Sequence, residues 1–181
     1  MRPVGETEFV NGIAAQSASG QYGKTRAAAG IVSFADLAMG AAVEAVLQAH
    51  IAAAPARFRG IRHAAGFDPS PEIRNSHTNP PADLYRSKKF REGFARLAPL
   101  GLSFDAWNYH PQIPELTELA RAFPGTTIIL DHFGGPLGTG PYEGKRAEIF
   151  PQWKKDLAEL ARCTNVVAKL GGINMPINGF G

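Results

Sequence analysis

Short apolar segments alternate with amphipathic segments along most of this chain. Five of them have apolar centres bounded by Gly, Pro or polar residues, which predicts strands over residues 27–32, 57–63, 102–107, 126–131 and 165–170. Apolar residues at helical spacing predict helices over 36–54 with Asp36 as N-cap, over 83–98, over 116–123 after Pro114, and over 150–160 with Pro151 near the start. This alternation predicts an α/β fold with a parallel sheet and crossover helices.

The segment before this pattern looks different. Residues 1–26 are rich in Gly, Ser and Ala and show no clear period, so we expect a lead-in loop followed by one domain over 27–181. The opening stretch MRPVGETEFVNG carries acids and lacks an apolar block, so it does not look like a signal peptide. No apolar run is long enough to span a bilayer, and we expect a cytoplasmic protein that binds no membrane.

Loop lengths predict where a site would lie. The helix-to-strand connections are short, whereas two strand-to-helix connections, residues 64–81 and 133–149, are long. Long loops after strand carboxyl ends build the active sites of α/β barrels and open α/β sheets. Five strands are too few for a closed barrel, which typically takes about 250 residues.

Composition and charge argue against several classes of protein and of site. Of the 181 residues, 44% are hydrophobic and 19% charged, which suits a folded core rather than a disordered chain. The net charge is +3, but the basic residues are spread out, so we expect no nucleic-acid partner. Cys163 is the only cysteine, which excludes an internal disulfide and a Cys-rich zinc site.

Four predicted strands end in a charged or proton-active residue: Arg62, Asp105, His132 and Lys169. Alternation places each on one face with its i−2 neighbour, and we expect all four to converge on the inward face at one end of the sheet. On this interpretation Asp131 faces the helical layer, while the glycines after His132 leave space beside the imidazole.

Each candidate also has a structural interpretation. Asp105 and Lys169 either line a site or form a supporting ion pair, and Arg62 either binds substrate or pairs with Asp105. His110 either lines the pocket or caps the helix that follows it, and His50 is expected at the surface. No HxH or HExxH metal motif is present.

In this order, RFRGIRH, LSFDAW with HPQIPEL, ILDHFGGP and VVAKLGG resemble the amidohydrolase-related family of metal-dependent TIM-barrel hydrolases. That family includes sugar lactonases, pyrone-dicarboxylate lactonase and carboxymuconate-type decarboxylases. The resemblance covers nearly the whole chain, including VGETEFVNG near the start.

The resemblance implies an incomplete (β/α)8 barrel that hydrolyses a small carboxylated lactone, ester or amide. In that family the residue matching His132 binds a divalent metal or polarises the attacked carbonyl. Arg62 would hold the substrate carboxylate, with Asp105 and Lys169 lining the pocket and His110 as a further binding residue. Some members work without metal.

The sequence also departs from the family pattern. Members begin with a strand carrying an HxH pair and end with a strand carrying the Asp that activates water, and neither is found here. We therefore expect roughly strands three to seven of a barrel truncated at both ends, with no cofactor of its own; zinc would bind His132 only if the missing ligands were supplied. The alternative to a hydrolase is a non-catalytic remnant, or a half-barrel that needs a partner chain. We expect self-association through the open sheet edges, and an isolated chain that is aggregated, molten or partner-dependent, with negligible lactonase activity.

Overall fold

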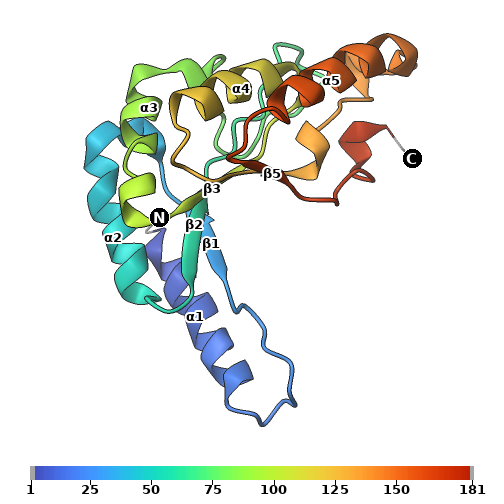
Figure 1. The fold of residues 1–181 in the computed structure, drawn as a ribbon. Coiled ribbons are helices and arrows are strands. Elements are labelled where there is room, and N and C mark those ends of the chain that lie inside the picture. Colours follow the sequence, from blue (N-terminus) through green and yellow to red (C-terminus); the bar gives the residue numbers. More distant parts are fainter. Residues whose placement is uncertain (1–2, 180–181) are drawn as a thin grey trace.

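The computed structural model describes residues 3–179, which form one parallel sheet with helices packed on one face (Figure 1). Five strands lie in sequence order, as β1 Ile31–Phe34, β2 Phe58–Arg62, β3 Ser103–Ala106, β4 Ile128–Leu130 and β5 Val166–Ala168. Each overlaps a predicted strand, but β1 was predicted over 27–32 and begins four residues later, because residues 27–30 form a turn. The α-helices are α1 Val4–Ala18, α2 Val43–Ala53, α3 Lys88–Phe94, α4 Ile113–Ala122 and α5 Arg146–Leu160. The predicted α/β fold, five parallel strands of an incomplete (β/α)8 barrel, is confirmed.

The predicted lead-in loop is wrong for Val4–Ala18, which forms helix α1, and residues 1–2 and 180–181 of the predicted segments lie outside the described part of the chain. The buried residues of α1 are Thr7 and Ala14. Because these side chains are small or polar, the helix has no large apolar stripe that a periodicity search could detect. Its exposed positions include Phe9.

A buried polar network fixes α1 to the sheet. The Thr7 hydroxyl lies 2.8 Å from His50 Nδ1 and 2.6 Å from the Ser33 hydroxyl, while His50 Nε2 lies 3.1 Å from the Phe34 carbonyl oxygen. His50 is fully buried, so the predicted surface position is wrong. Burial of His50 lowers its pKa, because a charged ring would lose solvation.

The other helices lie where the pattern predicts them, with altered ends. Asp36 accepts a hydrogen bond from the Ala38 N–H as predicted, but the first turns are a 3₁₀ helix, Leu37–Ala42, with a break at Gly40. Helix α3 is shorter than the predicted 83–98 and is flanked by the 3₁₀ turns Leu84–Arg86 and Ala98–Leu100. Helix α5 starts before Phe150, which places Pro151 inside it. Within residues 3–179, none of the helices combines the length and apolar character needed to cross a bilayer.

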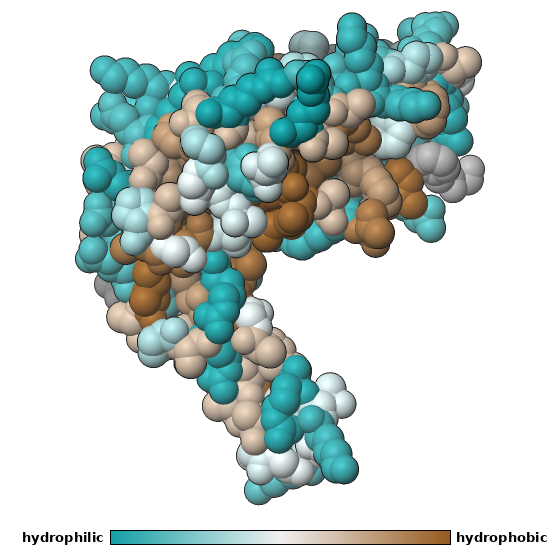
Figure 2. All heavy atoms as spheres, in the orientation of Figure 1, coloured by the Kyte–Doolittle hydropathy of each residue, from teal (hydrophilic) through white to brown (hydrophobic). Residues whose placement is uncertain are grey.

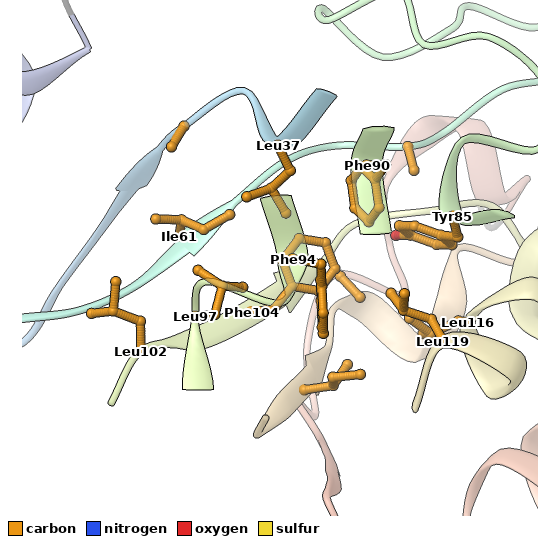
Figure 3. Packing of buried hydrophobic residues seen from close by; sticks show 14 of the residues in the cluster. Leu37, Ile61, Tyr85, Phe90, Phe94, Leu97, Leu102, Phe104, Leu116 and Leu119 are labelled. Atoms are coloured by element: carbon orange, nitrogen blue, oxygen red, sulfur yellow. The ribbon is translucent and has the colours of Figure 1, made fainter. Parts of the chain in front are cut away.

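The main core lies between the sheet and its helices. Phe104 and Ile61 on the strands pack with Phe90 and Phe94 of α3, and Phe94 lies 5.1 Å from Phe104 between ring centroids (Figure 3). Leu116 and Leu119 of α4 complete the same cluster. This packing decides which strand residues face the helices, and so which face the opposite side.

The opposite face of the sheet is only partly covered. Val32 is 40% exposed and Val167 53% exposed, and Leu170 just beyond β5 is 85% exposed. Figure 2 shows hydrophobic residues gathered on this side of the molecule. Among residues 3–179, no strand pairs with the outer edge of β1 or β5. This uncovered face corresponds to the interior of a complete barrel.

We expect Val167→Lys to reduce self-association of the isolated chain, because a charge on an edge strand opposes strand pairing. Sedimentation velocity over a concentration series measures the effect. Phe9→Lys changes an exposed apolar residue on helix α1 instead of on a strand and serves as a control. Equal association of the parent chain and Val167→Lys would show that the β5 edge is not the contact.

Acid should weaken the fold through the buried histidines. Burial lowers the pKa of His63 to about 4, while the unfolded chain titrates near 6.5. A lowered pKa gives stability that is complete above the unfolded value and is lost as pH falls from about 6.5 toward about 4, by up to about 3 kcal/mol for this residue. Urea unfolding at several pH values measures the loss. His63→Gln should flatten the profile, whereas exposed His77→Gln should not.

Candidate active site

Four charged side chains meet at the carboxyl ends of β2 to β5. Arg62 pairs in register with Asp105, and its Nη2 lies 3.3 Å from Asp105 Oδ2 and 2.9 Å from Asp131 Oδ2. Lys169 Nζ contacts Asp105 Oδ2 and lies 3.0 Å from Asp131 Oδ1. We call these residues the strand-end network. Each acid thus touches both cations, and each cation touches both acids.

The position of Asp131 corrects the predicted orientation of β4. Ile128 and Leu130 are buried in the main core, so the helical layer lies on their side and Asp131 faces the uncovered side. The prediction that Asp131 faces the helices is wrong. Ile129 pairs in register with Asp105 on the same side as Asp131. Both faces of this short strand are apolar, so its sequence alone does not mark which one the helices cover.

The strand-end network contains two positive and two negative charges, and its two carboxylates are almost completely buried. The side chains of Asp105 and Asp131 are 1% and 0% exposed, whereas those of Arg62 and Lys169 are 39% and 43% exposed. Burial alone would lower the pKa of Lys169, but its contacts with Asp105 and Asp131 outweigh burial and raise the pKa. Lys169 therefore stays a cation at neutral pH and is unsuited to act as a general base.

His132 lies just beyond this network on a strained turn. His132 and Phe133 have φ angles of 52° and 56°, in the left-handed region that non-glycine residues rarely adopt. The imidazole lies against Gly172, where an added Cβ would collide with the ring. Its Nδ1 is buried and has no hydrogen-bond partner among the described residues. The Trp153 indole N–H, 2.9 Å from the Phe133 carbonyl oxygen, holds the turn from α5.

His110 connects loops rather than capping a helix. Its Nδ1 accepts a hydrogen bond of 3.2 Å from the Leu137 N–H, and its ring packs edge-on against Tyr142. Tyr142 in turn donates a 2.6 Å hydrogen bond to Asp68, which joins the two long loops, 133–149 and 64–81. Burial lowers the pKa of His110 to about 4, so the ring is neutral and can accept this bond. Its predicted role in substrate binding stays a prediction.

Two cavities open near these loops. The larger, about 630 Å³, is lined mainly by the 133–149 loop together with Phe150 and Trp153, and none of the strand-end network lines it. The smaller, about 480 Å³, is lined by Arg62 together with Arg74, His77 and Trp107. We take the smaller cavity, called here the mouth pocket, as the candidate substrate site because it adjoins the network.

The mouth pocket rests on a small separate core. Ile73, Tyr109 and Leu137 are buried together, with Trp107 and Ile177 packed against them. These residues come from both long loops and from the segment after β5. The long loops are therefore anchored to each other as well as to the sheet.

A divalent metal does not fit the residues that are described. In residues 3–179, no three His, Cys, Asp or Glu side chains lie close enough together to hold one ion. Asp105 and Asp131 already contact two cations, and a metal would have to displace both. His132 is the one predicted ligand at this end of the sheet, and three or four protein ligands are usual for zinc.

Comparison with known proteins identifies the family of this chain. The family model described as "Amidohydrolase" matches residues 21–176. The chain belongs to the amidohydrolase family. A curated relative, the uncharacterized protein y4mH of Sinorhizobium fredii, is 34% identical over 174 residues, which cover 96% of this amidohydrolase chain and 51% of the relative.

Solved structures agree on the fold. An amidohydrolase from Burkholderia multivorans with bound zinc aligns with a TM-score of 0.66 at 24% identity, covering 93% of this chain and 50% of that one. A crystal form of such a protein from the same organism with bound HEPES gives a TM-score of 0.58 at 23% identity, covering 80% of this chain and 45% of that one. This amidohydrolase chain thus spans about half the length of these proteins.

The structure brings together three of the four predicted strand-end residues. Arg62, Asp105 and Lys169 are in contact as expected, and the fourth member of their network is Asp131, with His132 following it. Arg74 was missed because it lies in the 64–81 loop, where no strand or helix period indicates a direction. The catalytic and binding roles of these residues remain predictions.

Removing one cation should destabilise the strand-end network. In Lys169→Met the two buried carboxylates keep only Arg62, and we expect a loss of about 2 kcal/mol at pH 7, below the full cost of breaking a buried pair because Lys169 is partly exposed. Chemical unfolding at pH 7 measures it.

Lys154→Met, which removes an exposed lysine on α5, is the matched control. Adding Asp131→Asn to Lys169→Met should restore part of the lost stability. A Lys169→Met variant as stable as the Lys154→Met control would mean that the network contributes nothing.

Proposed function

We propose that this chain forms the substrate-binding and carbonyl-polarising half of a hydrolase site acting on a small carboxylated lactone, ester or amide. The observation that carries the proposal is the strand-end network beside the mouth pocket, in a chain of the amidohydrolase family. Barrel enzymes place their catalytic groups at this end of the strands.

Each group has a role that follows from its surroundings. Nδ1 of His132 is buried against Gly172, so Nε2 is the ring nitrogen left to polarise a substrate carbonyl. Arg62 and Lys169 neutralise the carboxylates of Asp105 and Asp131 at the same strand ends, so no net negative charge there opposes the charge that develops on the carbonyl oxygen. Asp105 and Asp131 hold these cations in place.

The same electrostatics limit what the described half can do alone. Asp105 and Asp131 are buried and each contacts two cations, so neither carboxylate is placed to take a proton from an attacking water. We therefore infer that the water-activating group lies in the other half of the barrel. The exposed Val167 and Leu170 favour this half-barrel form, in which a partner segment covers the open face, over a non-catalytic remnant.

The test compares the chain alone with a chimera. In the chimera this chain replaces the 174 matched residues of the Sinorhizobium fredii relative, which supplies the remainder. A pH-indicator assay over carboxylated γ- and δ-lactones should detect turnover in the chimera, and little or none in the chain alone. His132→Ala should lower kcat/KM by about 100-fold or more, as expected for loss of an oxyanion-stabilising group.

Two glycine variants test whether turnover depends on the position of the His132 ring. Gly172→Ala should push the His132 ring aside and reproduce much of the loss, whereas Gly171→Ala meets no atom within 4 Å and should not. Circular dichroism confirms that each variant folds. Turnover that survives His132→Ala would contradict the proposal, as would a folded chimera inactive on every lactone, ester and amide tried.

A further inference from the structure

Two arginines line the mouth pocket, and their charges are not equally available. Arg62 contacts both Asp105 and Asp131, and Lys169 contacts the same two acids. The four charges of the network therefore cancel. A substrate anion placed at Arg62 would meet a group that is already neutralised and would lie near two buried carboxylates.

Arg74 differs in this respect. Within residues 3–179, no carboxylate lies at ion-pair distance from its guanidinium. The nearby acid Asp68 is engaged elsewhere, because it accepts hydrogen bonds from the Tyr142 hydroxyl and the Ser70 N–H. Arg74 is therefore the uncompensated cation of the pocket.

The backbone at Arg74 is also fixed. The Tyr109 hydroxyl donates a short hydrogen bond to the Arg74 carbonyl oxygen, and Tyr109 belongs to the small core under the loops. On either side, Ile73 is buried in that core and the Asn75 side chain accepts a 2.8 Å hydrogen bond from the Asp68 N–H. A long loop tied in this way presents its arginine from a defined place, which lowers the entropy lost on binding.

Trp107 forms an apolar wall of the same pocket. Its ring lies directly on Gly66, where an added Cβ would come within 2.5 Å of it, so glycine is needed for this packing. Met175 and Ile177 add apolar surface from the segment after β5. The pocket thus combines an apolar wall with one uncompensated cation, which suits a small ring bearing a carboxylate.

We propose that Arg74, and not Arg62, binds the substrate's carboxylate, with the ring against Trp107. This assignment rests on the proposed function for the identity of the substrate, but the binding it describes does not require turnover. Arg62 instead serves as the counter-ion of Asp105 and Asp131.

The test measures binding of two ligands that contain no hydrolysable bond. Calorimetric titration of the 181-residue chain with tetrahydrofuran-2-carboxylate and with the neutral tetrahydrofuran-2-methanol compares the same ring with and without a negative charge. We expect the carboxylate to bind about fivefold more tightly, a size typical of a charged contact at a partly exposed site. Arg74→Gln should abolish this preference, and Arg74→Lys should keep part of it.

Arg26→Gln removes an exposed arginine outside the pocket and is the matched control, which should leave the preference unchanged. Arg62→Lys tests the alternative assignment, because it retains the positive charge that Asp105 and Asp131 require. Thermal melts confirm that each variant is folded. The assignment is overturned if the parent chain shows no preference for the carboxylate, or if Arg62→Lys removes the preference while Arg74→Gln keeps it. If the carboxylate binds through Arg74 but the chimera hydrolyses no lactone, ester or amide, the proposed function is contradicted. The assignment of Arg74 is then still supported.

Discussion

The burial of two carboxylates is the constraint on which the carboxyl end of this sheet depends. Asp105 and Asp131 are almost completely removed from water, and an unpaired charge in such a place costs several kcal/mol. Arg62 and Lys169 therefore have to reach them from strands on either side. Because side chains alternate along a strand, a one-residue slip of β2 or β5 would turn its cation to the other face. The ion network thus fixes the register of four strands as well as the chemistry at their ends.

Much of the sheet can be predicted from local sequence, because apolar runs bounded by Gly and Pro mark strands wherever they pack. The orientation of β4 cannot, because Ile128 and Ile129 are equally apolar and only the packing under α4 decides between them. Helix α1 is hidden for another reason: it docks through Thr7 and Ala14 and through a hydrogen bond to His50, far away in sequence. Pocket residues such as Arg74 depend on loop contacts that have no periodic signature.

Family membership and structure answer different questions about this chain. The family match relates this chain to amidohydrolases. The fold shows that the chain forms part of a barrel like that of a solved amidohydrolase. The strand-end residues determine which part of that chemistry this half can carry. On the proposed function they supply a histidine held on a strained turn and a pocket, whereas both the cations and the acids of the network are committed to ion pairs. The proposed division of an active site between two halves of a barrel rests on these contacts.

The small core formed by Ile73, Tyr109 and Leu137 has a consequence for how such a protein can change over evolution. The walls of the mouth pocket are supported by this cluster, and the sheet and helices are supported by another. A substitution at Met175 or Trp107 can therefore reshape the pocket without altering the packing around Phe94. Mutations in the loops can therefore change ligand specificity while any loss of stability is confined to the loops. The sheet and its helices keep their structure.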